Sequence, residues 1–133
     1  MQEQTSSTSK TDPIIIEQAG MRMTIGHRQG LGGNDEGLTF DITVAGDETK
    51  RILRFDCFYK NPHYHVGASG EQHVHKMKDE GIEDSVRWTL EQLKTRLPSM
   101  VEDAGYEEIA GRIDQQAMAD QLMKLEPEII AKY

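Results

Sequence analysis

The sequence predicts an α+β fold, in which an antiparallel sheet of hairpins from the N-terminal half is covered by helices from the C-terminal half. Two observations lead to this prediction. The first half holds short β-branched runs and alternating apolar and polar side chains, whereas the second half repeats its apolar residues every third or fourth position. Because strand patterns come first and do not alternate with helix patterns, the sheet should be antiparallel, with helices packed on one face.

The first predicted strands are short and precede a long connection. Residues 14–16 are three consecutive isoleucines, and residues 21–25 form a second apolar stretch. Both segments are typical of strands. Residues 26–37 contain five glycines, which predicts a loop, and the spacing of these glycines does not match the common phosphate-binding motifs.

Two hairpins are expected to complete the sheet. Apolar and polar side chains alternate through residues 38–44, residues 45–49 supply a turn, and residues 52–58 return beside the first strand. A second hairpin is predicted to pair residues 63–66 with residues 73–76 around a turn that contains glycine. The sheet should therefore end at this second hairpin.

The second half of the chain predicts helices. Spacings of three and four residues place one apolar stripe on an amphipathic helix, formed by Ile82, Val86, Leu90, Leu93 and Leu97. Asp84 or Ser85 is expected to cap the start of this helix, and Pro98 to end or kink it. Further stripes predict helices between residues 109 and 129, with Pro127 interrupting the last of them.

Length and composition indicate one domain. Residues 1–12 of the 133 are polar and predict a disordered tail, and residues 13–133 are expected to form a single domain. The single cysteine, Cys57, leaves no partner for an internal disulfide, and we expect it to be buried. No apolar run reaches the roughly 20 residues of a membrane span, and the first residues lack an apolar signal segment, so we expect a cytoplasmic protein.

The charge of the chain is unevenly distributed. The net charge is -8 at pH 7, yet residues 50–78 carry six basic and two acidic side chains. The acidic total argues against nonspecific binding to nucleic acid. The basic segment is either ordinary surface charge or a small site that faces a phosphate group.

The residues most suited to chemistry gather in this basic segment. Four of the five histidines lie in two H-x-H pairs, and an arginine and an aspartate stand two positions apart in the preceding strand. Side chains at i and i+2 of a strand share a face, so we expect one surface of the hairpin to present the whole set. The candidate site residues are Arg54, Asp56, His63, His65, His73 and His75.

Three interpretations of the histidines remain open. They form an ordinary polar strand face, or three or four of them ligate a transition metal, with zinc as the first choice. In the third interpretation they act without a cofactor, as acid and base on a phosphodiester. Arg54 would then stabilise the charge that develops on the phosphate, and Asp56 would orient a histidine or raise its pKa.

The same segment resembles a known family. The runs Arg54–Asp56, Pro62–His63 and His73–Lys76 are similar to motifs of the TumE-type small toxins of bacterial toxin–antitoxin operons. The resemblance covers roughly residues 52–97 and implies a ribonuclease-like toxin that acts on RNA and pairs with a cognate antitoxin. The alternative is a non-enzymatic protein, either a zinc-type metal binder or an acidic protein-interaction module.

Overall fold

A computed structural model describes residues 12–67 and 74–133 of the chain. Six strands form one sheet in chain order, and every neighbouring pair is antiparallel. The strands are β1 (Ile14–Gln18), β2 (Met21–Gln29), β3 (Glu36–Val44), β4 (Asp47–Phe58), β5 (His63–Val66) and β6 (Val74–Lys76). Residues 1–11 of the predicted disordered tail lie outside the described residues.

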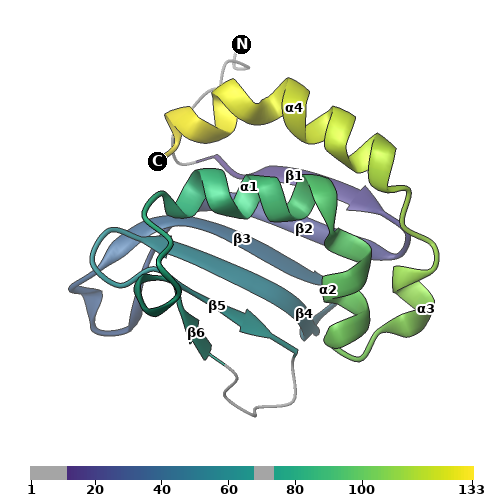
Figure 1. The fold of residues 1–133 in the computed structure, drawn as a ribbon, viewed down its shortest axis with the longest axis horizontal. Helices are drawn as coiled ribbons and strands as arrows, with labels where there is room; N and C mark the ends of the chain where they lie inside the picture. Colours follow the sequence, from purple (N-terminus) through teal and green to yellow (C-terminus); the bar gives the residue numbers. More distant parts are fainter. Residues whose placement is uncertain (1–11, 68–73) are drawn as a thin grey trace.

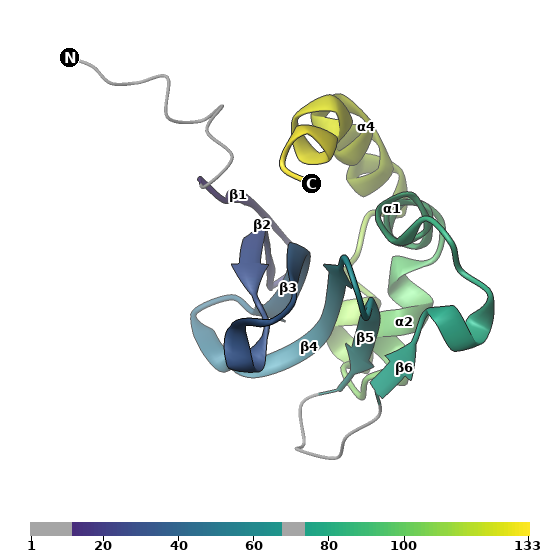
Figure 2. The ribbon, with the colours of Figure 1, turned by 90° about the vertical axis from the view of Figure 1, so that its left-hand side faces the viewer.

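Helices follow the strands along the chain, as the sequence predicts. They are α1 (Ser85–Thr95), α2 (Leu97–Asp103), α3 (Glu107–Ala110) and α4 (Gln115–Ala131), with short 3₁₀ turns η2 (Leu31–Gly33) and η3 (Lys78–Glu80) in two loops. Figures 1 and 2 show α1, α2 and α4 on one side of the sheet. The α+β fold class is therefore confirmed. Within the described residues, no helix is both long and apolar enough to cross a membrane.

Aspartates fix where the two longest helices begin. The side chain of Asp84 accepts a hydrogen bond from the backbone N–H of Arg87 at 3.1 Å, and Asp114 does the same for Ala117 at 3.0 Å. Each carboxylate satisfies an N–H group that the first turn of the helix leaves without a partner. Pro98 stands in the first turn of α2, where its missing N–H costs nothing, so it separates α1 from α2.

The expected interruption at Pro127 is wrong, because α4 continues through this residue to Ala131. Proline removes one hydrogen bond of the helix. The helix nevertheless stays packed on both sides of the proline, since Leu122 and Ile129 are completely buried. Tertiary packing of an apolar face supplies most of the stability of a helix in a protein, and here it outweighs the lost bond.

The glycine-rich loop is shorter than predicted. Strand β2 runs to Gln29 and β3 begins at Glu36, so Gly26 and Gly37 belong to strands. At Gly37 the neighbouring strand comes very close: a Cβ atom there would lie 2.1 Å from the carbonyl oxygen of Cys57. Glycine is required at this position by close approach of two backbones, and it does not mark a turn.

The core lies between the sheet and the helices. Phe40 and Phe55 are fully buried, and Leu90 of α1 packs into the same cluster. The ring of Phe55 stacks on that of Tyr64, with centroids 5.5 Å apart, and Trp88 of α1 contacts both rings. The side chains of Tyr64 in β5 and Phe55 in β4 therefore face the helices, and their strand neighbours Asp56 and His63 face the other way.

Candidate functional site

The alternation of strand β5 brings two of the predicted histidines onto the face opposite the helices. His63 pairs with Asp56 of β4, and His65 pairs with Arg54. Directly opposite residues of neighbouring strands share a face. Arg54, Asp56, His63 and His65 therefore form one cluster, which we call the histidine–aspartate site.

One oxygen atom is at the centre of this cluster. The Oδ2 atom of Asp56 lies 3.1 Å from Nε2 of His63 and 3.4 Å from Nε2 of His65. The Nε atom of Arg54 also lies 3.4 Å from it. The Asp56 side chain is 2% exposed and the two imidazoles about 15% exposed, so the groups meet largely out of contact with water.

The orientation of His63 is fixed by its second ring nitrogen. Nδ1 lies 2.8 Å from the carbonyl oxygen of Asn61, and a carbonyl oxygen only accepts hydrogen bonds, so Nδ1 carries the proton. In a neutral imidazole Nε2 then presents its lone pair to the Asp56 carboxylate. Two acceptors facing each other at this distance need a positive group between them, either a second proton on His63 or a metal ion.

The charges of the cluster shift its titration. Burial opposes ionisation of Asp56, but the imidazoles of His63 and His65 and the guanidinium of Arg54 outweigh it and hold the pKa of this carboxyl well below its usual range. The hydrogen bond to Asp56 raises the pKa of His63, and burial only partly opposes this effect. Asp56 is consequently a carboxylate at neutral pH, which is the form that binds cations.

Buried polar atoms without hydrogen-bond partners concentrate around this carboxylate. Of the seven such side-chain atoms found among the described residues, five lie here: Thr39 Oγ1, Asp41 Oδ1, Arg54 Nε, Asp56 Oδ1 and His65 Nε2. Thr39 is opposite Asp56 in the sheet and Asp41 is opposite Arg54, so all five atoms share one patch. Buried polar groups are normally satisfied, and most of the exceptions among the described residues concentrate in this one patch.

A neighbouring loop supports His63 from outside. The carboxylate of Asp35 accepts hydrogen bonds from the backbone N–H groups of Lys60 and Asn61 at 3.0 and 2.9 Å. It also accepts one from Glu36 at 2.9 Å. This loop lines a pocket of about 310 Å³ that reaches His63, bordered by Gly30, Asn34 and Phe58. The pocket gives a small molecule access to the edge of the histidine–aspartate site.

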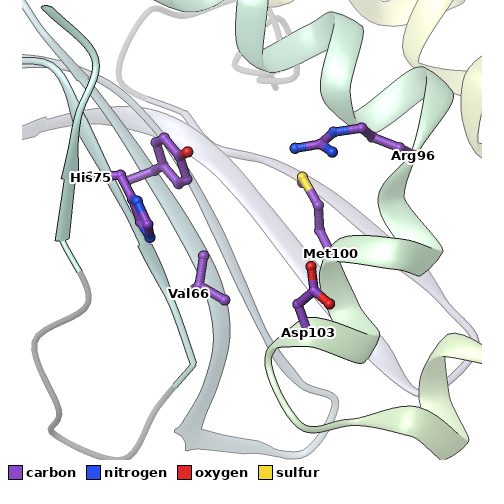
Figure 3. A pocket seen from close by; sticks show the side chains of 6 residues that line it. Val66, His75, Arg96, Met100 and Asp103 are labelled. Carbon is purple, nitrogen blue, oxygen red and sulfur yellow. The ribbon is translucent and has the colours of Figure 1, made fainter. Parts of the chain in front are cut away.

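One of the other two predicted histidines, His75, is not part of this cluster. His75 pairs with Tyr64 in the register of β5 and β6, so it faces the helices, and its ring stacks on that of Tyr64 with centroids 4.7 Å apart. Figure 3 shows His75 at a different pocket, between the strands and α2, together with Val66, Arg96, Met100 and Asp103. His73 lies outside the described residues. The expectation of one surface with four histidines therefore does not hold for His75.

Four residues around the histidine–aspartate site were not singled out from the sequence. Thr39 and Asp41 occupy the polar positions of an alternating strand, which reads as a solvated face. Asp35 and Asn61 lie in loops, and only the folded chain brings them together. The one usable signal was the strand register, since Asp41 and Arg54 fall on facing strands of a predicted hairpin.

The chemistry available at the site follows from its donors. Two imidazoles and one carboxylate place their ligand atoms within 4.8 Å of one another, which is a donor set for a transition-metal ion. Without a metal, the same groups are an acid–base pair with an adjacent guanidinium.

Comparison with known proteins gives a family but no activity. The family model described as "Domain of unknown function (DUF7700)" matches residues 15–129, which covers both the sheet and the helices. No curated protein and no solved structure matches the chain significantly. The match contains nothing that links the chain to the TumE-type toxins.

Proposed function

The chain belongs to the DUF7700 family, a domain of unknown function, and from the site alone we propose that it binds one divalent transition-metal ion, in the first instance zinc. Asp56, His63 and His65 are the proposed ligands. The observation that carries the proposal is the convergence of both imidazole Nε2 atoms on Oδ2 of Asp56.

The contact between His65 and Asp56 suits a shared metal ion better than a hydrogen bond. In a tetrahedral zinc site with metal–ligand distances of about 2.0–2.1 Å, neighbouring ligand atoms are about 3.3–3.4 Å apart. The carboxylate oxygen is 3.1 Å from one imidazole nitrogen and 3.4 Å from the other. The second contact does not satisfy the geometry of a hydrogen bond, because Nε2 of His65 has no such partner within the described part of the chain.

The surroundings of His63 also fit a ligand. Metal-bound histidines usually donate their other N–H group to a carbonyl or carboxylate, which fixes the tautomer and directs the lone pair at the metal. The carbonyl of Asn61 accepts this bond from Nδ1 of His63. The bond between Asp35 and the Asn61 backbone then holds that carbonyl in place.

Zinc is the first choice for chemical reasons. It accepts mixed nitrogen and oxygen ligands, and sites with three protein ligands keep a fourth position for water or substrate. A bound zinc ion would supply a Lewis acid and lower the pKa of a coordinated water. The protein's own part is to hold the three ligands in place and to keep Asp56 ionised.

Metal content tests the proposal directly. Untagged protein, freed of loosely bound ions and analysed by elemental mass spectrometry, should contain close to one equivalent of zinc. His65→Ala should reduce this content strongly, since it removes one of three ligands. His75→Ala is the matched control, because this histidine stacks on Tyr64 on the opposite face, and its metal content should equal that of the wild type. Equal zinc in all three proteins would remove the site from consideration.

A second function remains a candidate because one observation favours it. The bond to Asp56 raises the pKa of His63, so this imidazole can donate a proton near neutral pH, while Arg54 stands beside it as a cation. This combination suits metal-independent cleavage of an RNA phosphodiester, as the toxin resemblance implies, with an antitoxin-like partner. Cleavage of single-stranded RNA by pure protein in the presence of a chelator, reduced about 100-fold or more in His63→Ala, would support it over the metal site.

A further inference from the structure

Arg54 of the histidine–aspartate site shares its face of the sheet with two further arginines. Arg28 of β2 pairs with Gly37, which lies two positions from Thr39 along β3. Arg51 of β4 pairs with Thr43, two positions from Asp41; the register shifts by one extra residue of β4 just before this pair, so Arg51 and Arg54 share a face although they are three positions apart. Residues two apart in a strand share a face, so Arg28, Arg51 and Arg54 all stand on the face that carries Asp56.

These charges act on one another. The carboxyl group of Asp41 interacts electrostatically with the positive charges of Arg54, Arg51 and Arg28. Arg54 and Arg28 also act on Arg51, at which burial is the largest influence and lowers the pKa. The arginines therefore form one electrostatic group, which we call the arginine face.

The positive charge of the arginine face exceeds the negative charge of the carboxylates beside it. Three guanidinium groups face the two carboxylates of Asp41 and Asp56, and a divalent metal would add further positive charge. The Nε atom of Arg54 and the hydroxyl of Thr39 are buried and have no hydrogen-bond partner among the described residues. Both groups can donate hydrogen bonds to an acceptor.

We propose that the arginine face binds a small oxyanion of the phosphate class next to the histidine–aspartate site. An anion would supply acceptors for Arg54 and Thr39 and would balance the excess of positive charge. Guanidinium groups match the oxygen atoms of phosphates and carboxylates in geometry as well as charge. The chain as a whole carries a net charge of -8, so an anion would be attracted to this face and repelled elsewhere.

The inference deepens the proposed metal site, since an oxyanion would lie beside the bound ion, but it rests on the arginines and has its own test. Inorganic phosphate is the first probe and acetate the second, because a carboxylate shares the chemistry of an oxyanion but not its tetrahedral shape. Each is titrated by calorimetry into protein that holds its own metal without excess, and into protein treated with chelator.

Two variants and one control make the test specific. Arg54→Gln and Arg51→Gln should each weaken phosphate binding by about ten-fold or more, the usual effect of losing a charged hydrogen bond. Arg51 is only partly buried, so Arg51→Gln keeps the test valid where Arg54→Gln impairs folding. Arg112→Gln removes the same charge from the turn after α3, where Arg112 pairs with Glu108, and should bind phosphate like the wild type.

The outcomes separate this inference from the proposed metal site. Saturable phosphate binding that both arginine variants weaken supports the oxyanion site, and weaker binding of acetate selects phosphate over carboxylate. Absence of saturable binding for both anions, or equal binding in all variants, overturns it. If the wild type contains no metal but phosphate binds and depends on Arg51 and Arg54, the metal proposal fails and this inference stands.

Discussion

The carboxylate of Asp35 and the backbone N–H of Asn61 lie 2.9 Å apart, although the two residues belong to different loops. Through this hydrogen bond the β2–β3 loop holds the carbonyl group to which His63 donates its Nδ1 proton. The position of a proposed metal ligand is thus controlled by a side chain that has no contact with the metal site. Such supporting bonds are commonly required for tight metal binding.

Asp35→Asn should therefore weaken zinc binding by about 10- to 100-fold, the typical effect of losing a supporting partner of a ligand. An amide oxygen is a weaker acceptor than a carboxylate and cannot hold three N–H groups equally well. Zinc affinity is measured by competition with a chromophoric chelator. Asp47→Asn is the control, because Asp47 also accepts hydrogen bonds, from Thr49 at the start of β4, but these bonds support no proposed ligand. Equal losses in both variants would point to a general effect on folding.

Acid stability gives a second measurement on the same residue. Partial burial opposes ionisation of Asp35, but hydrogen bonds from the backbone of Lys60, Asn61 and Glu36 outweigh it and lower its pKa. A carboxyl whose pKa is lower in the folded state stabilises the fold above its unfolded pKa, and this contribution disappears as the pH falls through the folded value. The stability difference between wild type and Asp35→Asn should shrink below about pH 4. A difference that stays constant down to pH 2 would contradict this assignment.

The helix-side core should depend on Leu90, which is almost completely buried in α1 against the sheet. Leu90→Ala should lower the free energy of unfolding by about 2–5 kcal/mol, because it removes buried methyl groups and leaves a cavity. Chemical denaturation followed by Trp88 fluorescence measures this loss. Ile15→Ala is a suitable comparison, since Ile15 is half exposed on the other face of the sheet and its truncation should cost far less.

Part of this site is predictable from the sequence, and the limit is set by strand register. The pairs Arg54/Asp56 and His63/His65 share faces because strand side chains alternate, which needs no knowledge of the fold. Whether His75 joins them depends on how β6 aligns with β5. The observed alignment places His75 opposite Tyr64, and a shift of one residue would reverse the face. Residues 68–73, between the two strands in sequence, lie outside the described residues.

The glycine-rich segment shows a second limit of what the sequence predicts. A run of glycines predicts a loop because glycine tolerates unusual backbone angles. Gly26 and Gly37 instead lie in strands, and at Gly37 the reason is the closeness of Cys57 in the neighbouring strand. That contact joins residues 20 positions apart, so no local pattern reports it. The support that Asp35 gives to Asn61 is not predictable for the same reason, because the two residues are far apart in sequence.

Gly37→Ala should be strongly destabilising, although it adds only one methyl group. The added Cβ would lie 2.1 Å from the Cys57 carbonyl oxygen and 2.8 Å from Cα of Phe58, and both are backbone atoms that yield only if the strands separate. We expect a loss of about 1–3 kcal/mol, as in overpacked cores. Gly26→Ala is the matched strand control, because its Cβ would meet Pro13 at an ordinary contact distance of 3.6 Å. Similar stability of both variants in thermal denaturation would refute the argument.

Cys57 should be unreactive in the native protein. Burial raises the pKa of its thiol to about 11, although a contact with the Thr89 hydroxyl at 3.5 Å partly opposes this effect. Since the thiolate is the reactive form, labelling with a disulfide reagent at pH 8 should be slow in native conditions and complete in denaturant. Rapid stoichiometric labelling of the folded protein would show that the thiol is accessible.

Zinc should stabilise the folded protein through the histidine–aspartate site. A ligand that binds only the folded state at about 100 times its dissociation constant adds about 2.7 kcal/mol of stability. Thermal denaturation should therefore shift upward when zinc is added to chelator-treated wild type, and the shift should disappear in Asp56→Asn and His65→Ala. His75→Ala should keep the full shift, because its imidazole lies on the helix side of the sheet, stacked on Tyr64. A shift retained in Asp56→Asn, or lost in His75→Ala, would place the zinc somewhere other than the three proposed ligands.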